Sequence, residues 1–381
     1  MSDGAIHNVG ANLPQCSRCV LPQNYPGVSF DAAGVCSNCH RHDRHRPAPL
    51  GEEALRKAVE PYRDSSRKHD CAFALSGGRD STYSLYVAVK VLKLRPIAFT
   101  VDQGFIPDET WESMANATKA LGVEHVIVKH DIMERTIRPM LTTWLKRPSP
   151  GLITFMCLGC RWGLYKNLRK LSYEYSHLPI CLTGNGEPEE EDFSWAFYSK
   201  DGETGSRTMA LARGIARDLL ANPGYLVRPY LPWRMFIEGL YVTKPTRLIR
   251  KLTGLRWKNV DVLRYLPYEE QKIENILRNE LGWKKYGRAS AGWRSDCKLP
   301  LIKNAMYMKL FGFTRHDGLI SGVVRRGLMT REEGLARLEK DNVIPEEFVR
   351  EFFTELGLSY DETWGRARWD QARLPTQPAS G

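Results

Sequence analysis

Fifty-five lysine and arginine residues outnumber 44 aspartates and glutamates in this chain of 381 residues, which gives a formal net charge of +11 at pH 7. A chain of this length can bury a substantial core and form two or three structural units. No apolar run approaches the roughly 18 residues that cross a membrane, and the polar start MSDGAIHNVG is not a signal peptide, so we expect a cytoplasmic protein without a membrane span.

Two C-x-x-C pairs stand near the N-terminus. Cys16 and Cys19 form the first pair, and Cys36 and Cys39 form the second. In a cytoplasmic chain this spacing favours a metal over disulfides, and four thiolates close the coordination sphere of a structural zinc ion. We therefore predict a zinc module over residues 1–50, with free or redox-active thiols as the alternative. The neighbouring histidines, His40 and His42, are read as solvated surface residues.

A basic, proline-containing linker and a helix over residues 52–66 are expected next, and they lead to the sequence CAFALSGGRDST of residues 71–82. Its apolar run predicts a buried strand and the amphipathic TYSLYVAVKVL predicts a helix, so a glycine-rich turn joins the two. Glycines let a phosphate approach the backbone, and the first N–H groups of a helix attract anions. The turn is therefore a candidate phosphate cradle, although its spacing is not that of a Walker P-loop.

The pattern S-G-G-x-D-S resembles the pyrophosphate loop of the N-type ATP pyrophosphatases, which cleave ATP between its α and β phosphates and adenylylate an oxygen atom. The alternative is a turn without a ligand. The resemblance assigns ATP binding to the loop and the helix start, and Arg79 would offset charge on the departing pyrophosphate. The loop residues concerned are Ser76, Gly77, Gly78, Asp80, Ser81 and Thr82.

Further strands are predicted over residues 96–102, 125–129 and 178–184, with helices between them. This alternation indicates an α/β fold with a doubly wound parallel sheet, similar to the adenine nucleotide alpha hydrolases, over residues 51–255. Ligands bind beyond the carboxyl ends of such strands. Asp102 ends a strand and would reach the base or the ribose of the nucleotide, or it is simply a turn residue.

Two more candidate groups follow in the chain. Cys157 and Cys160 stand at a predicted helix start, where thiol pKa values fall, so they are metal ligands or reactive groups, or else two small packing residues. Glu187 is the first acid after the strand over 178–184 and is a candidate Mg²⁺ ligand, although acidic runs are usually solvated loops. Residues 193–256 are read as an aromatic insert.

The C-terminal part, residues 256–370, is predicted to be helical, with a disordered tail over 371–381. Thr330 and Glu333 suit a helix cap, and Cys297 lies in the sequence RSDCK. The motifs ELGWKKYG, RSDCK and VVRRGLMTREEGLARLEKDNVIPEEF, after the loop and the N-terminal cysteines, resemble the N-acetyl sugar amidotransferases of bacterial surface-polysaccharide and pseudaminic-acid pathways.

This resemblance implies an ATP-dependent amidotransferase of lipopolysaccharide biosynthesis. An acetamido group on a nucleotide-activated sugar would be adenylylated on its oxygen and converted by ammonia to an acetamidino group, with Mg²⁺ assisting. The ammonia would come from a glutaminase through a cyclase-like partner subunit. The zinc role falls on the four N-terminal cysteines.

A second enzyme class shares the activation step. Cys157, Cys160 and Cys297 form a three-thiolate set, and the chain also resembles thiolases that hold a [4Fe–4S] cluster with three cysteines and transfer sulfur to tRNA or a small substrate. The basic charge would suit RNA in that case, but charge alone identifies no partner and we expect a nucleic acid less than a nucleotide-like substrate. A scaffold that has lost catalysis is a third alternative, against which the intact Asp80 and Ser81 argue.

Overall fold

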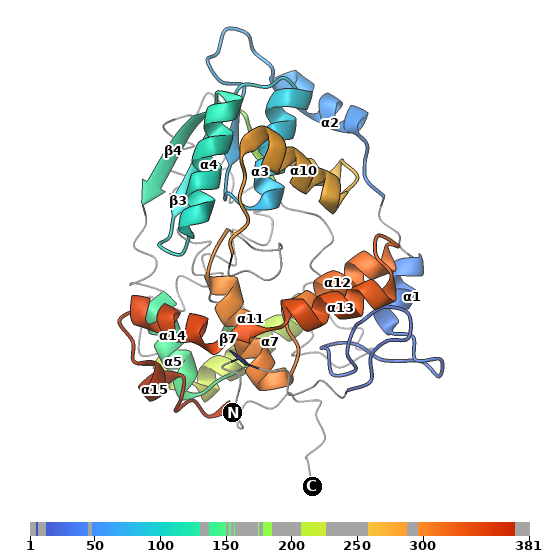
Figure 1. Cartoon of the computed structure of the whole chain (residues 1–381), viewed down its shortest axis with the longest axis vertical. Helices are drawn as coiled ribbons and strands as arrows, with labels where there is room; N and C mark the ends of the chain where they lie inside the picture. The colour runs from blue at the N-terminus through green and yellow to red at the C-terminus, as the bar shows by residue number, and fades with distance from the viewer. Residues whose placement is uncertain are drawn as a thin grey trace.

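The computed structural model describes residues 5–6, 13–44, 48–129, 137–149, 152–153, 156, 174, 178–184, 207–225, 258–287 and 296–369. A sheet with its helices forms one part, and a helical part contains the C-terminal residues (Figure 1). Within the described ranges, no helix combines the length and the apolarity needed to cross a membrane.

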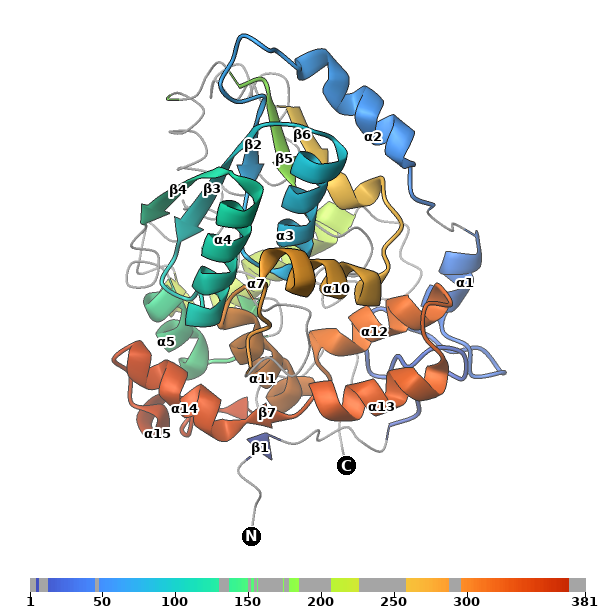
Figure 2. The same cartoon turned by 45° about the horizontal axis from the view of Figure 1, so that its top comes forward.

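Five parallel strands form the sheet, in the order β4-β3-β2-β5-β6 (Figure 2). Chain order runs outward from β2 in both directions, which is the arrangement of a doubly wound sheet and confirms the predicted fold class. The register places Ala72 of β2 between Ile97 of β3 and Cys181 of β5. The strands are β2 (Cys71–Ala74), β3 (Pro96–Asp102), β4 (Glu124–Lys129), β5 (Ile180–Thr183) and β6 (Lys258–Asp261).

Three helices cover one face of this sheet: α3 (Arg79–Tyr86), α4 (Asp108–Leu121) and α10 (Glu270–Leu281) (Figure 2). Their apolar side chains share a core with Phe73 of β2 and Leu182 of β5. Alternate strand residues, among them Phe99 and Cys181, form a second buried cluster. Both faces of the central strands are therefore buried, as a parallel sheet requires.

The sheet extends past the boundary predicted at residue 255, because β6 is its fifth strand and α10 packs on α3 and α4. Gly282, at a φ of +62°, ends α10, and the chain then passes to the helical part. The remaining elements that precede α10 in the chain are β1 (Ala5–Ile6), α1 (Ser37–Arg44), α2 (Glu52–Val59), α5 (Arg138–Lys146) and α7 (Arg207–Ala221).

The helical part buries aromatic side chains, including Trp144, Phe352 and Trp364, in one core with the four N-terminal cysteines. The short strand β1 pairs with β7, so the N-terminus is tied to this part rather than to the sheet. Its elements are α11 (Leu299–Phe311), α12 (Arg315–Arg325), α13 (Arg331–Asp341), β7 (Ile344–Pro345), α14 (Glu346–Glu355) and α15 (Tyr360–Thr363).

Capping boxes fix the starts of two of these helices. Thr330 and Glu333 form the one predicted for α13, and Thr314 and Asp317 form one on α12 that was not predicted. Each cap contributes about 1 kcal/mol by satisfying amides that the first helical turn leaves unpaired.

Candidate nucleotide and metal sites

The glycine-rich loop follows β2, at the point where the strand order reverses between β2 and β5. Gly184, directly after β5, touches the start of α3 so closely that a Cβ there would stand 2.5 Å from the Cα of Ser81. Only a glycine permits this approach. The loop therefore occupies the crevice in which doubly wound folds bind their ligands.

Two glycines form the turn between β2 and α3, and at Gly77 a larger residue would not fit. Gly77 has a φ of +78°, and a Cβ at this position would lie 2.5 Å from Thr110 and 2.7 Å from Met114. Gly78 precedes the first residue of α3. Within the described part of the chain, the amides of Gly77 and Gly78 donate no hydrogen bond. Two unpaired amides at a helix N-terminus form an anion cradle, which fits a phosphate group.

Serine hydroxyls hold the shape of this cradle. The Oγ of Ser81 lies 3.0 Å from the Oγ of Ser76, accepts from the Ser76 amide and donates to the carbonyl oxygen of Gly78. The Thr82 amide, which we expected to be free for a phosphate, donates to Gly78 at 3.0 Å. That part of the prediction is wrong, because Thr82 already belongs to the hydrogen-bonded part of the helix.

Asp80 and Arg79 lie in a network of side chains from the sheet domain. Asp80 Oδ1 accepts from the hydroxyl of Tyr268 at 2.8 Å and from Arg79 at 3.2 Å. Arg79 is 3% exposed, and its guanidinium stacks over the Tyr268 ring and donates to Glu270 at 2.6 Å. The contact that we expected between Arg79 and pyrophosphate stays a prediction, while the observed contacts hold the helix start in place.

Glu270 connects this network to the helical part. It accepts hydrogen bonds from Arg337 of α13 at 2.9 and 3.0 Å. Burial alone would raise the pKa of Glu270, but the hydrogen bonds and charges of Arg337 and Arg79 outweigh it and hold this pKa below its ordinary value. The carboxylate therefore stays charged between its two guanidinium partners.

Two segments of the chain after α10 contact the glycine loop. Trp283 is buried and donates from its indole nitrogen to the carbonyl oxygen of Gly77 at 3.0 Å. Asp296 lies against Gly78, since a Cβ on that glycine would stand 3.2 Å from the Cβ of Asp296. Lys298 donates its amide to Phe105, in the loop after β3. The sequences ELGWKKYG and RSDCK are thus both in contact with the loop region.

Four residues that contact this loop or its flanking residues were not singled out from the sequence: Tyr268, Glu270, Trp283 and Asp296. Trp283 and Asp296 lie in motifs that marked the family, but nothing in their spacing showed that they fold back onto residues about 200 positions earlier. The one sequence feature that could have drawn attention to Trp283 is its position directly after Gly282, the glycine that ends α10.

The other expected site residues have separate places. Asp102 accepts from the Gly104 amide at 2.9 Å, as a turn residue does, and its role toward a nucleotide stays a prediction. Cys297 is 8% exposed and follows Asp296 directly. Cys157, Cys160 and Glu187 lie outside the described residues.

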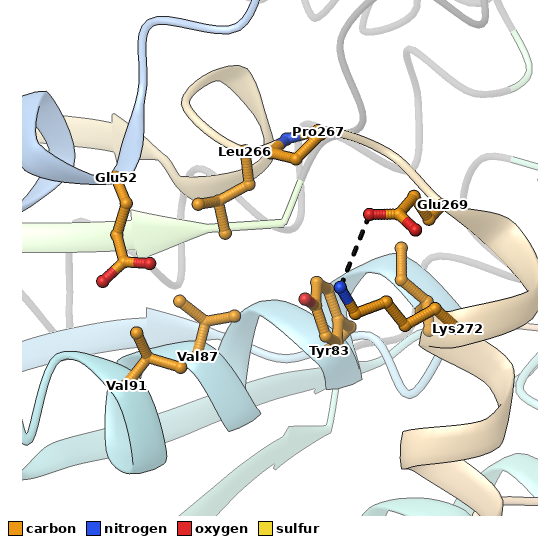
Figure 3. A pocket seen from close by; sticks show the side chains of 9 residues that line it. Glu52, Tyr83, Val87, Val91, Leu266, Pro267, Glu269 and Lys272 are labelled. Atoms are coloured by element: carbon orange, nitrogen blue, oxygen red, sulfur yellow. Dashed lines mark hydrogen bonds and ion pairs between the residues drawn. The ribbon is translucent and has the colours of Figure 1, made fainter.

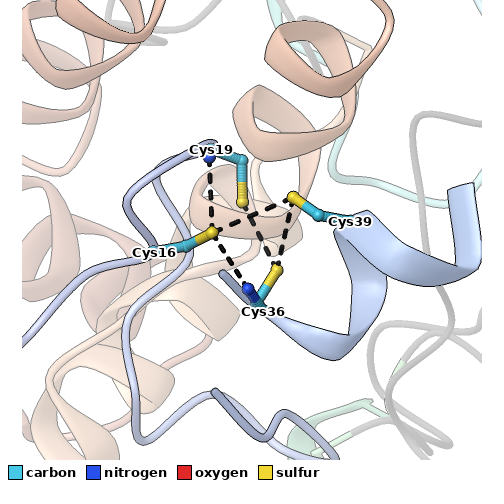
Figure 4. A group of neighbouring side chains, drawn as sticks. All are labelled: Cys16, Cys19, Cys36 and Cys39. Carbon is cyan, nitrogen blue, oxygen red and sulfur yellow. Dashed lines mark hydrogen bonds between the residues drawn. The ribbon is translucent and has the colours of Figure 1, made fainter. Parts of the chain in front are cut away.

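Four sulfur atoms meet in the N-terminal module (Figure 4). The Sγ atoms of Cys16, Cys19, Cys36 and Cys39 lie within 4.8 Å of one another, with separations of 3.5, 3.6 and 3.9 Å for three pairs. Tetrahedral zinc at about 2.3 Å from each sulfur places the sulfurs about 3.8 Å apart. This group can therefore hold a single metal ion, whereas a four-iron cluster would need the sulfurs further apart.

Hydrogen bonds link the four thiols to one another, to the backbone and to the helical part. The amides of Cys19 and Cys36 donate to the Sγ of Cys16, at 3.4 and 3.2 Å. Hydrogen bonds from Cys19 and Cys39 lower the pKa of the Cys36 thiol, whereas hydrogen bonds with Cys19 raise the pKa values of Cys16 and Cys39. Arg325 of α12 donates to the Sγ of Cys19 at 3.8 Å, and Arg331 of α13 donates to the carbonyl oxygens of Cys16 and Cys19, both at 3.0 Å. The helical part thus supplies positive charge beside the thiolates.

A small cavity of about 150 Å³ lies beside Tyr83 of α3 and the helical residues 87–91 that follow it, and no residue of the glycine loop lines it (Figure 3). Val87, Val91 and Ile273 give it apolar walls, and Lys272 and Glu269 form an ion pair at its edge. It is too small for a nucleotide, since ligand pockets usually exceed about 300 Å³. The phosphate cradle is therefore the better candidate site.

Comparison with known proteins gives one family match. Residues 280–371 match the model of the C-terminal domain of the LPS biosynthesis protein WbpG-like family. The C-terminal region is thus similar to a domain of bacterial lipopolysaccharide biosynthesis, in agreement with the resemblance noted in the sequence. An uncharacterized protein of Methanocaldococcus jannaschii, MJ1599, is 22% identical over 343 residues, which are 88% of this chain and 97% of that protein.

Two solved structures share weak similarity. The U34-tRNA thiolase NcsA from Methanococcus maripaludis, with its [4Fe-4S] cluster, is 17% identical over 86% of this chain and 88% of its own, at a TM-score of 0.33. NAD+ synthetase from Burkholderia pseudomallei is 15% identical over 66% of this chain and 87% of its own, at a TM-score of 0.25. These scores are too low to bear on the chemistry of this chain.

Proposed function

We propose that this chain is an ATP-dependent amidotransferase that converts the acetamido group of a nucleotide-activated N-acetyl sugar to an acetamidino group. The observation that carries the proposal is the cradle of unpaired Gly77 and Gly78 amides in the crevice between β2 and β5. The match of residues 280–371 to a lipopolysaccharide biosynthesis domain supports the choice of a sugar substrate.

The reaction balances without a protein nucleophile. An amide carbon is a poor electrophile because its nitrogen donates electrons to it. Attack of the amide oxygen on the α-phosphorus of ATP expels pyrophosphate and leaves AMP on that oxygen. Ammonia then adds to the carbon, and AMP departs with the former amide oxygen.

In this scheme the residues of the chain bind the phosphates of ATP and keep the start of α3 in place. The amides of Gly77 and Gly78 and the dipole of α3 hold phosphate oxygens and stabilise the charge on departing pyrophosphate. Asp80 is fixed by Tyr268 and Arg79, so the helix start keeps its geometry as the phosphates leave. Mg²⁺ bound with the triphosphate would neutralise further charge.

Other components follow from the same proposal. Zinc is the ion that we assign to the four N-terminal cysteines, in a structural role, because four thiolates leave no position for a substrate. A glutaminase and a cyclase-like subunit would supply ammonia in the cytoplasm. No nucleic acid is required.

Product analysis tests the proposal. The wild-type protein, given ATP, ammonia and a nucleotide-linked N-acetyl sugar, should form AMP and pyrophosphate, and ¹⁸O in the acetamido group should appear in AMP. Asp80→Ala should abolish both products and leave the metal content unchanged, whereas Asp361→Asn, at an exposed ion pair with Arg350, should behave as the wild type. Release of ADP in place of AMP would refute the proposal.

A second candidate is sulfur transfer by the same activation step. It is favoured by the position of Cys297, which is buried and directly follows a residue in contact with the glycine loop. With Cys157 and Cys160 it would hold a [4Fe–4S] cluster. Protein purified without oxygen should then be brown with about four irons per chain, and colourless protein would exclude this candidate.

A further inference from the structure

Cys19 of the N-terminal module has a partner in the C-terminal helices. The guanidinium of Arg325, in α12, donates to the Sγ of Cys19 at 3.8 Å. Arg325 is 8% exposed and Cys19 is completely buried, so this contact lies inside the protein, although 306 positions separate the two residues in the chain. An arginine and a cysteine of the four-sulfur group thus meet away from solvent.

Packing of the module against α12 and α13 fixes the place of this contact (Figure 2). Val20, which follows Cys19, is completely buried in a cluster with side chains of both helices. Gly334 of α13 lies so near that a Cβ there would stand 3.2 Å from the Cγ1 of Val20. Arg331 holds the backbone of the turn, because it donates to the carbonyl oxygens of Cys16 and Cys19. The helix pair therefore positions the sulfur atom that Arg325 reaches.

A metal ion held by these four cysteines needs positive charge beside it. Four thiolates around one divalent ion carry two more negative than positive charges. A charge is costly to bury unless opposite charge or hydrogen-bond donors reach it. The amides of Cys19 and Cys36 reach the Sγ of Cys16, but an amide is only a dipole. Arg325 brings a full positive charge to the Sγ of Cys19.

A second arginine stands near the sulfur atoms but differs in its surroundings. Arg18 lies between Cys16 and Cys19 in the chain, its side chain is 42% exposed, and it donates two hydrogen bonds to the carboxylate of Asp43. That carboxylate and the solvent offset its charge. Arg18 and Arg325 therefore allow a charge in the neighbourhood to be distinguished from a buried contact with a sulfur atom.

We propose that Arg325 is an outer-shell partner of the metal ion, so that α12 completes a metal centre whose four ligands all come from the N-terminal module. This inference rests on the zinc assignment made with the proposed function, and it does not depend on the nucleotide site. The guanidinium stabilises the metal-bound thiolates by offsetting their charge. Because coupling between two sites is reciprocal, the bound ion in turn holds α12 against the module.

Metal affinity, measured apart from catalysis, tests the inference. Competition with a chromophoric chelator gives the affinity for Zn²⁺, and the absorption bands of bound Co²⁺ report coordination by four thiolates. Arg325→Met, which keeps most of the side-chain length but not the charge, should weaken Zn²⁺ binding by about tenfold or more, as loss of an outer-shell partner does. The Co²⁺ spectrum at saturation should keep its four-thiolate form, because all four ligands remain.

Arg18→Met is the matched control, since it removes the same charge near the same sulfur atoms from an exposed side chain, and it should bind Zn²⁺ as the wild type does. Arg325→Lys, which is close in size to Arg325→Met but keeps a positive charge, should recover part of the affinity.

Three results would overturn the inference alone: wild-type Zn²⁺ affinity in Arg325→Met, an equal loss in Arg18→Met, or no recovery in Arg325→Lys, which would assign the loss to packing. A wild-type protein whose Co²⁺ complex lacks the four-thiolate spectrum would instead overturn the zinc assignment.

Discussion

Arg337 of α13 donates two hydrogen bonds, of 2.9 and 3.0 Å, to the carboxylate of Glu270 in α10. The same carboxylate accepts from Arg79, which begins α3 next to the glycine loop. At its other end α13 carries Arg331, which donates to the carbonyl oxygens of Cys16 and Cys19. One helix therefore contacts both the cysteine module and the support of the phosphate cradle.

Glu270→Gln should loosen the start of α3. The variant keeps the shape of the side chain but removes the charge between Arg79 and Arg337, and we expect a loss of about 2 kcal/mol of unfolding free energy. The rate of AMP release should fall about tenfold with a smaller change in KM for ATP, because the loop amides remain present but less well oriented. Thermal melting and steady-state kinetics check these two effects.

Glu274→Gln is the control for this prediction. The Glu274 carboxylate stands 3.7 Å from the Arg79 guanidinium, at the limit of an ion pair. The Glu274→Gln variant should therefore lose less stability than Glu270→Gln and keep the wild-type rate of AMP release. Equal effects of the two variants would show that general charge, rather than the Glu270 contact, supports the loop.

Gly77→Ala should abolish nucleotide binding. Its positive φ is costly for alanine by about 1 kcal/mol or more, and the added methyl group would meet Thr110 and Met114 at 2.5 and 2.7 Å. Gly51→Ala separates the two causes, because Gly51 also has a positive φ, +93°, with no atom within 4 Å of the added methyl group. Titration calorimetry with ATP should show normal binding for Gly51→Ala, and equal loss in both would contradict the steric argument.

Local pattern was enough to predict the strands β2 to β5 and the glycine loop, because each is a short apolar run followed by residues of fixed steric requirement. The strand β6 was missed, since KNVD has only one buried side chain and no apolar run. The contacts of Trp283 and Asp296 with the loop were also missed, because they join residues far apart in the chain and leave no periodicity. The four cysteines were predictable, since metal-ligand spacing is itself a local pattern.

Cys36→Ser should remove the metal ion from the N-terminal module. Three thiolates and a hydroxyl bind zinc more weakly, and the sulfur separations of 3.5 to 3.9 Å bring like charges together once the ion is lost. We expect less than a tenth of the wild-type metal content and a lower melting temperature, measured by elemental analysis and calorimetry. Cys71→Ala, at a buried thiol in β2, should keep the metal, and a full metal content in Cys36→Ser would disprove the assignment.

Asp317 should make the stability of the helical part depend on pH. Burial raises its pKa to about 6, although hydrogen bonds from the Thr314 amide and Asn342 act in the opposite direction. The folded-state pKa lies above the unfolded value of 3.8, so its contribution to stability is fully present below that value and is lost as pH rises through about 6. The wild type should therefore lose about 1 kcal/mol between about pH 5 and about pH 7.5 through this group.

Asp317→Asn isolates this effect, because an amide keeps an acceptor for the Thr314 amide and cannot ionise. Urea unfolding of both proteins with metal bound, at the two pH values, gives the difference in unfolding free energy between them. That difference should shift in favour of the variant as the pH rises, since only the wild type then carries a buried charge. A difference that stays constant would mean that Asp317 keeps one protonation state over this range, and that its capping box alone determines its contribution.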